Sequence, residues 1–274
     1  MTNIRELDPG SSPLAYYGAE LRRMREDAGL TLQQLGGIVF CTGSLIGQIE
    51  TARKAPTRQI TERLDAALGT GGALLRLWKL VSRSQLPYWF QPYAEIEAIA
   101  TSIATFQAQL VHGLLQTEEY ARAVLGAVTQ DRLAERVEAR MERQRILDRA
   151  NPPLVWIILD EAVLHRPIGG REVMRGQLAH LLSFREREDV NVQILPFEGG
   201  AHAGLMGSFT LLRFEEEPDI VYTEDYDRGH MTFNPANMRD RSLRYDLLQA
   251  SALPVEDSAK LIAQVMEERY GEHP

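Results

Sequence analysis

Polar and cationic side chains gather in one short segment near the start of the chain. From Gly29 to Thr57 the sequence reads GLTLQQLGGIVFCTGSLIGQIETARKAPT, which contains two short helical patterns separated by about three residues. Amides and hydroxyls can reach base edges in a DNA groove, while cations and backbone N–H groups meet phosphates. This chemistry predicts DNA contacts from Thr31, Thr42, Gly43, Ser44, Gly47, Gln48, Arg53, Lys54 and Arg58.

The apolar spacing predicts the helices that would position these side chains. Over 13–28 apolar residues recur at three- and four-residue steps, and Gly29 is a natural residue to end that helix. Thr31 followed by Gln34 fits the capping box that starts a helix. We therefore predict an all-α domain of five helices over 13–28, 32–39, 43–51, 57–68 and 73–82, preceded by a disordered lead over 1–12.

The helix pair should bury one side and expose the other. The predicted buried side is Leu35, Val39, Ile46 and Ile49, which turns Gln48 and its small neighbours outward at the start of the second helix. Glutamine favours adenine among the bases. The cations Arg53, Lys54 and Arg58 would then lie where phosphates pass.

The same residues carry a resemblance to a known family. SLIGQIETARKAPT (44–57) resembles the end of the recognition helix in Xre/Cro-type helix-turn-helix proteins, and LRRMREDAGLT (21–31) resembles their first helix and turn. Two positions depart from that pattern: Leu32 stands where the family often has Gln, and Ala52 where it usually has Gly. The departures leave open a protein adaptor whose helix-turn-helix does not bind DNA. The matching residues are Ser44, Ile46, Gly47, Ile49, Glu50, Arg53 and Pro56.

Charge is divided unevenly along a chain of net charge −8. The first 83 residues hold 11 Lys and Arg against 8 Asp and Glu, and the remaining residues hold 19 against 30, so the two parts carry +3 and −11. A basic segment on an acidic body can still bind nucleic acid, and the acidic remainder permits a basic partner.

Beyond an aromatic linker over 84–91 the patterns indicate a larger α+β domain over 92–274. Apolar residues at 96, 99, 103, 106 and 110 predict one amphipathic helix. About four strands are predicted, over 154–160, 190–196, 207–214 and 219–225, with the last two forming a hairpin. Further helices are predicted over 118–128, 132–149, 169–187, 235–250 and 254–270.

No motif for catalysis or metal binding emerges in this second domain. The six histidines show no metal-ligand spacing, and the glycine-rich stretch over 197–209 lacks the Lys and Ser/Thr of a phosphate-binding loop. We therefore expect no catalytic residue, no metal and no cofactor. An enzyme or toxin with a DNA-targeting head stays as the alternative, and it would require Asp160, Glu161, His112 and His202 to converge.

The second domain also carries a resemblance. The stretches over 87–125, 154–182 and 191–214 resemble a C-terminal domain fused to Xre-type modules in high-GC, differentiating bacteria. Such proteins look like antitoxin-like transcriptional regulators that are often encoded beside a small partner protein and tied to development or antibiotic production. We therefore predict a regulator that binds a double-stranded DNA operator as a homodimer, with a small protein as the first candidate effector and a metabolite as the second; no established small-molecule ligand comes with the family.

Two loops are candidate partner or effector sites. HGLLQTEEY (112–120) and GGAHAGLMG (199–207) combine apolar tips with hydrogen-bonding groups, and they would line a groove if they share one face. The alternative is that their leucines and methionine belong to the core. The candidate residues are His112, Leu114, Leu115, Gln116, His202, Leu205 and Met206.

Location and cysteine use complete the prediction. No run approaches the ~18 apolar residues of a membrane span, and no secretory signal begins the chain. Cys41 is the single cysteine, so no internal disulfide forms and a cytoplasmic protein is expected. Cys41 lies in the predicted turn between the paired helices, where its thiol could act as a redox switch or have only a structural role. The sequence shows no basic residue or second cysteine nearby that would support redox chemistry, which favours the structural role.

Overall fold

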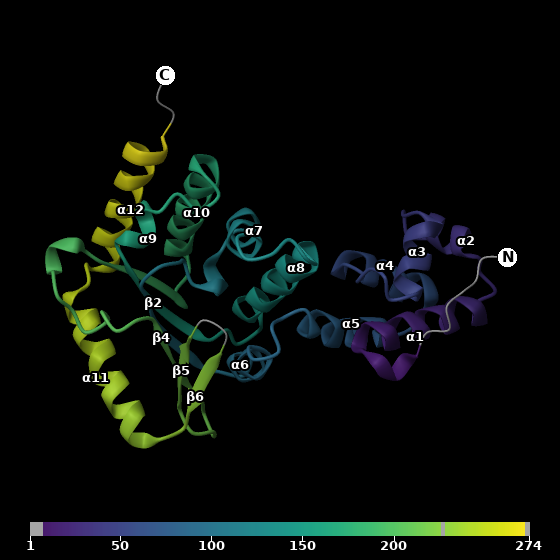
Figure 1. The fold of residues 1–274 in the computed structure, drawn as a ribbon, viewed down its shortest axis with the longest axis horizontal. Helices are drawn as coiled ribbons and strands as arrows, with labels where there is room; N and C mark the ends of the chain where they lie inside the picture. Colours follow the sequence, from purple (N-terminus) through teal and green to yellow (C-terminus); the bar gives the residue numbers. More distant parts are fainter. Residues whose placement is uncertain (1–7, 226–227, 272–274) are drawn as a thin grey trace. The chain divides into compact units, whose positions relative to one another are not determined.

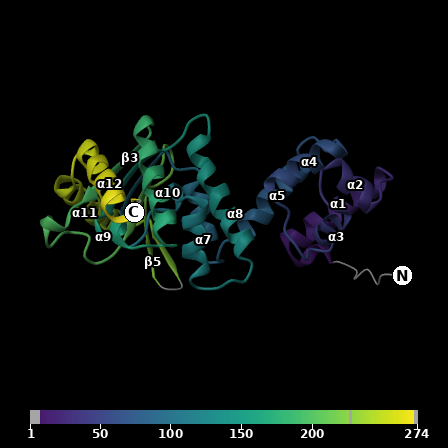
Figure 2. The ribbon, with the colours of Figure 1, turned by 90° about the horizontal axis from the view of Figure 1, so that it is seen from above.

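The computed structural model describes residues 8–225 and 228–271, and the chain divides into two compact units, Met1–Pro87 and Tyr88–Pro274 (Figures 1 and 2). Residues 1–7 of the predicted disordered lead lie outside the described residues. The rest of that lead is ordered: Pro9–Ser11 forms a short 3₁₀ helix, and the Ser12 hydroxyl accepts a hydrogen bond from the Ala15 N–H. The prediction of disorder was therefore wrong at 9–12, because Ser12 caps the first helix.

The first unit is the predicted five-helix domain. Hydroxyl caps start four of its helices, at Ser12, Thr31, Thr42 and Thr57, and Thr31 and Gln34 form the predicted capping box. The helices are α1 (Pro13–Asp27), α2 (Leu32–Ile38), α3 (Gly43–Glu50), α4 (Arg58–Leu68) and α5 (Ala73–Ser84).

The core of this unit holds the helix pair between the other helices. Leu35, Val39, Ile46 and Ile49 are buried there, as predicted from their spacing. Two buried polar groups are satisfied within the core: the Tyr17 hydroxyl donates to the Thr61 hydroxyl at 3.1 Å, and the Trp78 indole N–H donates to the Pro56 carbonyl at 2.8 Å. The pair α2 and α3 is thus fixed by apolar burial from both sides.

The second unit is built on a six-stranded mixed sheet in the order β3-β2-β1-β4-β5-β6. The strands β1, β2 and β3 are parallel, and helices connect them; β4, β5 and β6 continue the sheet antiparallel from β1. The predicted hairpin of the last two strands is confirmed as β4 and β5. The strands are β1 (Ser102–Gln107), β2 (Leu154–Asp160), β3 (Val190–Leu195), β4 (Phe209–Arg213), β5 (Ile220–Glu224) and β6 (Gly229–Thr232).

Helices cover the two faces of the sheet unequally (Figure 1). On one face Tyr93 of α6 stacks on Tyr222 of β5, and α10 and α12 pack together against the Val192 side of β3. On the other face α11 contacts β1, β3, β4 and β5, with Tyr245 and Leu248 in the core beneath it. The helices of this unit are α6 (Gln91–Glu97), α7 (Glu118–Gly126), α8 (Leu133–Gln144), α9 (Ala162–His165), α10 (Arg171–Ser183), α11 (Pro235–Ser251) and α12 (Val255–Tyr270).

The prediction of one helix through 96–110 was wrong. The helix α6 ends at Glu97, and Ser102–Gln107 is β1, paired with β2 on one side and β4 on the other. A central strand is buried on both faces, so Ile103 and Phe106 are both in the core and the alternation of a strand is lost. The strand β6 was also missed, because its four residues include too few apolar side chains to show the alternation of a strand.

None of the helices in the described parts of the chain is long and apolar enough to cross a membrane.

Candidate nucleic-acid interface

The two helices of the pair cross at glycines. A Cβ atom on Gly36 would lie 2.8 Å from the Cys41 carbonyl oxygen, and one on Gly43 would lie 3.0 Å from the Gln33 nitrogen. Such contacts are too close for a side chain, so both glycines allow α2 and α3 to approach. The prediction that Gly43 faces outward was wrong, since this residue faces α2. A Cβ on Gly47 would touch the Leu32 side chain at 3.5 Å, so Leu32 and Gly47 also belong to the contact between the helices.

The outward residues at the start of α3 are hydrogen-bonding side chains. Thr42, Ser44 and Gln48 are exposed, and the Gln48 amide lies 3.5 Å from the Ser44 hydroxyl one turn earlier. Thr42 also accepts a hydrogen bond from the Leu45 N–H at 3.2 Å, so it caps the helix as well. Thr31, the cap of α2, is exposed too. This surface presents amide and hydroxyl groups at a helix N-terminus, where the helix dipole favours anions.

The predicted cations differ in how much of their charge is available. Arg53 and Lys54 are exposed, and within residues 8–225 and 228–271 neither has an ion pair. Both donate their backbone N–H groups to the Gln48 carbonyl, at 2.9 and 3.3 Å, which fixes the chain directly after α3. Arg58 is half-buried; its guanidinium pairs with Glu62 at 2.8 Å and lies 5.9 Å from the centre of the Trp78 ring. Arg58 is therefore partly neutralised by its own helix.

One cation near the turn was not predicted from the sequence. Arg63 of α4 is exposed, and its guanidinium lies 5.8 Å from the centre of the Phe40 ring and 3.4 Å from the Val39 carbonyl oxygen. Its place beside the turn between α2 and α3 results from how α4 packs. No motif or spacing in the sequence indicates it.

A buried ion pair fixes α3 against α1. The Arg25 guanidinium donates to both carboxylate oxygens of Glu50, at 2.6 and 2.9 Å, and also to the Leu30 carbonyl at 2.8 Å. Glu50 is buried, and the hydrogen bonds that it accepts raise the pKa of Arg25. Nearby, a Cβ on Gly18 would lie 2.6 Å from the Ile49 carbonyl oxygen, so α1 touches the backbone of α3. Glu50, one of the residues that match the recognition-helix pattern, therefore clamps α3 to α1 and is not a surface charge.

Both helices of the pair end on a residue in the left-handed backbone region. Phe40 has φ 59° and Ala52 has φ 53°, and the N–H that follows each closes the turn, from Cys41 to the Gly36 carbonyl at 2.8 Å and from Arg53 to the Gln48 carbonyl at 2.9 Å. Glycine adopts this conformation without strain, whereas other residues do so at a cost. Ala52 packs against the core, while Phe40 is 84% exposed.

Cys41 lies in the turn as predicted. It is half-buried, and its Sγ atom lies 3.7 Å from the Thr42 carbonyl oxygen. Burial raises the pKa of the thiol, and the nearby Arg63 offsets only part of this effect. A raised pKa disfavours the reactive thiolate, which agrees with a structural thiol.

In the second unit the segment 112–116 is core. His112, Leu114, Leu115 and Gln116 are all buried, so this segment does not line an open groove, and the alternative that its leucines belong to the core is confirmed. Side-chain amides satisfy the backbone of this segment: Gln116 donates to the Val111 carbonyl, and Gln144 donates to the Gly113 and Gln116 carbonyls, all at 2.8 to 2.9 Å. Burial, aided by Arg143, lowers the pKa of His112 to about 3, so the imidazole is neutral.

The loop at 197–207 has the opposite character. Leu205 is 66% and Met206 88% exposed, whereas His202 is turned inward. The His202 Nε2 atom lies 3.6 Å from the Asp160 carboxylate, and its Nδ1 atom accepts a hydrogen bond from the Gly204 N–H at 3.2 Å. The loop is therefore held at its base while its apolar tip faces outward.

The four ionisable residues that the enzyme alternative required do not form one cluster. Asp160 pairs with His202, Glu161 pairs with His165 at 3.1 Å, and His112 instead lies beside Glu97 and Arg143. In the described parts of the chain no group of three or more His, Cys, Asp or Glu side chains is placed to hold a metal ion.

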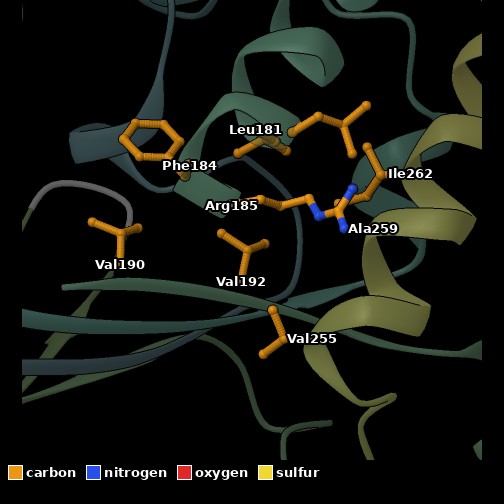
Figure 3. A pocket seen from close by; sticks show the side chains of 9 residues that line it. Leu181, Phe184, Arg185, Val190, Val192, Val255, Ala259 and Ile262 are labelled. Atoms are coloured by element: carbon orange, nitrogen blue, oxygen red, sulfur yellow. The ribbon is translucent and has the colours of Figure 1, made fainter. Parts of the chain in front are cut away.

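A small apolar cavity lies between α10, β3 and α12 (Figure 3). Its volume of about 20 Å³ suits a water molecule and is far below that of a site for a small-molecule effector. The residues that line it are Leu181, Leu182, Phe184, Arg185, Val190, Val192, Val255, Ala259 and Ile262.

Comparison with known families agrees with this division of the chain. A helix-turn-helix domain matches residues 17–78, and a domain of unknown function, DUF5753, matches residues 90–264. The chain belongs to the DUF5753 family. The helix-turn-helix match supports DNA-binding regulation, and the DUF5753 match brings no assigned activity to the second unit. No curated protein and no solved structure matches the chain.

Proposed function

We propose that this DUF5753 protein is a sequence-specific DNA-binding transcriptional regulator of the Xre type. The observation that carries the proposal is the surface of α3: Thr42, Ser44 and Gln48 are exposed at and near its N-terminal end, and Arg53 and Lys54 follow with their charges unpaired among the described residues. A helix-turn-helix uses this end of its second helix to read the major groove.

The contacts in this proposal divide into two kinds. The Gln48 amide reads one base pair, with adenine favoured, and the Ser44 hydroxyl, 3.5 Å away, restricts its rotation. Arg53 and Lys54 neutralise phosphates and make binding salt-dependent without reading sequence. Two copies are proposed to bind an inverted repeat, each reading one half-site.

The second unit is proposed to bind the effector, in an antitoxin-like manner and in the cytoplasm. The exposed apolar tip of Leu205 and Met206 and the net charge of −11 beyond residue 83 support a small basic protein as partner; a metabolite is the second candidate. An effector that favours one dimer geometry shifts operator affinity by its differential binding. Catalysis has no part in the proposal.

The proposal is tested by fluorescence-anisotropy titration of the full chain against DNA from its own promoter region, at two salt concentrations, with unrelated DNA as competitor. Sequence-selective binding that weakens with salt supports a DNA-binding regulator. Adding the product of the neighbouring small gene tests the partner. Absence of selective binding at both salt concentrations would contradict the proposal and leave the adaptor.

Two variants distinguish base recognition from phosphate binding. Gln48→Ala should cost ~1–3 kcal/mol of discrimination at one base pair, whereas Arg53→Ala should weaken all sequences alike and reduce the salt slope. Lys79→Ala, an exposed cation on α5 of the same unit, is the matched control and should change neither. Equal behaviour of all three variants would remove α3 from the interface.

A further inference from the structure

The helix α11 stands apart from the other helices of its unit. It packs against the sheet face formed by Phe106, Ile158 and Leu211, and no other labelled helix of the unit lies outside it (Figure 1). Tyr245 and Leu248 point from α11 into this core. Its outer surface is therefore free within the described part of the unit.

That outer surface carries an apolar stripe. Leu243 is 60% and Leu247 53% exposed, and their spacing of four residues places them on one side of the helix. Ala236 and Ala250, also exposed, continue the stripe above and below. Leucines one turn apart on the outside of a helix are typical of a helix–helix contact.

Charged residues flank the stripe in a self-complementary order. At 100° per residue, Arg239 and Asp246 lie on one flank of Leu243, and Asp240 and Arg244 lie on the other. Arg244 pairs with Asp240 at 2.9 Å along the same helix. Arg239 and Asp246 are exposed and have no ion pair among the described residues.

In an antiparallel pair of α11 helices, the charged residues on both flanks lie opposite residues of opposite charge. In a two-fold pair each flank meets the same flank of the other copy, with the sequence running in the opposite direction. Placing Leu243 at the two-fold axis brings Arg239 opposite the second copy's Asp246, and the same register brings Asp240 opposite its Arg244. Ala236 then lies opposite the second copy's Ala250. A sequence that is complementary to itself in one register indicates a second copy as the occupant.

We propose that α11 is the contact helix of a homodimer, paired antiparallel about Leu243 with its counterpart in a second copy of this chain. This inference rests on the proposed function, in which two copies bind an inverted repeat. The contact of the two leucine stripes supplies the apolar burial, and the Arg239–Asp246 pairs fix direction and register. Because each copy carries −11 beyond residue 83, the dimer is more stable at moderate than at low salt.

Sedimentation equilibrium of the full chain, without DNA, tests the interface. The wild-type chain should be dimeric at micromolar concentration, and Leu243→Asp should raise the dimer Kd by ~30-fold or more because it places two carboxylates at the two-fold axis. Val128→Asp alters an exposed apolar residue elsewhere in the same unit and should leave the dimer unchanged. Circular dichroism confirms that each variant is folded.

Charge reversal tests the register. Arg239→Asp and Asp246→Arg, each alone, place like charges opposite each other twice per dimer and should raise the dimer Kd by ~10-fold. The double variant restores opposite charges and should recover the wild-type Kd. A monomeric wild-type chain, or a double variant as weak as the single ones, would overturn the inference.

DNA binding separates this inference from the proposed function. The Leu243→Asp monomer should keep its affinity for a single half-site and lose the added affinity for two half-sites. If the wild-type chain is a dimer with the predicted variant pattern yet binds no DNA selectively, the proposed function fails and the interface stands. If it binds a half-site selectively and remains a monomer, the interface fails and the function stands.

Discussion

Both units contain a buried arginine–glutamate pair with two hydrogen bonds. In the first unit Arg25 of α1 holds Glu50 of α3 at 2.6 and 2.9 Å. In the second unit Arg143 of α8 holds Glu97 of α6, with the Nη2 atom 2.9 Å from Oε1 and the Nε atom bonded to Oε2. The residues of the pairs are 25 and 46 positions apart in sequence, so each pair fixes two separate helices.

The two pairs differ in what surrounds them. Glu97 is fully buried and also accepts a hydrogen bond from the Tyr93 hydroxyl at 2.8 Å, while Arg143 lies 4.9 Å from the centre of the Phe90 ring. Burial alone would raise the pKa of Glu97, but Arg143 holds it below its ordinary value. Glu50 has a second cation at 3.6 Å, Arg22, which is partly exposed. The Glu97–Arg143 pair therefore stabilises the core of the second unit. The Glu50–Arg25 pair holds α3, whose other side is exposed, and Arg22 offers Glu50 a second partner.

The largest expected effect is at the fully buried pair. Glu97→Gln leaves the Arg143 charge buried without a carboxylate, so the second unit should lose ~3–5 kcal/mol of unfolding free energy. Hydrogen exchange measured by mass spectrometry reports peptides of each unit separately. Glu188→Gln, at an exposed position, is the control and should have little effect. A loss below ~1 kcal/mol would show that the Glu97–Arg143 pair contributes no more to stability than an exposed ion pair does.

A smaller effect is expected at the clamp on α3. In Glu50→Gln the Arg25 guanidinium keeps the Leu30 carbonyl at 2.8 Å, so the first unit should lose ~1.5–3 kcal/mol, and operator affinity should fall with it. The matched control is Glu62→Gln, which breaks only the exposed pair with Arg58 and should cost ~0.5 kcal/mol or less. Stability lost without loss of operator affinity would argue against a positioning role for the clamp.

The pH dependence should also separate the two units, because all six histidines lie beyond residue 111. The pKa of His112 falls from 6.5 to about 3 on burial. Between these two values the imidazole of His112 is protonated in the unfolded chain and neutral in the folded unit. The free energy of unfolding therefore decreases as pH falls from about 6.5 towards 3, by up to ~1.4 kcal/mol per pH unit. His112→Asn, whose amide oxygen can still accept from the Leu114 N–H, should flatten this dependence. An unchanged slope in the variant would assign it to other groups.

The smallest effects concern the helix ends of the first unit. Ala52→Gly should raise its unfolding free energy by ~0.5–1 kcal/mol, because glycine relieves the left-handed backbone at φ 53°. Gly29→Ala, at φ 68° after α1, should lower it by a similar ~1 kcal/mol. Thermal unfolding of the two variants beside the wild type measures both. A decrease in Ala52→Gly would mean that the packing of the Ala52 methyl group outweighs the strain.

The parts of the fold that sequence predicted are those with local causes. The caps at Thr31, Thr42 and Thr57 and the glycine after α1 depend on hydrogen bonds within a few residues, so their types and spacing mark the helices. The exposure of Ser44 and Gln48 follows from the same periodicity that buries Ile46 and Ile49. The hairpin of β4 and β5 was predictable for the same reason, because the two strands are neighbours in sequence and a short turn joins them.

The tertiary structure decided what depends on neighbours distant in sequence. Ser102–Gln107 became a strand because β2 and β4 pair with it from both sides, which overrode a helical spacing. His112 was buried by α8, Gly43 was turned toward α2, and Arg63 was brought to the turn by α4. By itself the sequence determined a helix-turn-helix unit with exposed hydrogen-bonding and cationic side chains, followed in the chain by an acidic α+β domain. Only packing decided which polar groups remain exposed, since burial depends on the surfaces that meet and not on residue type alone.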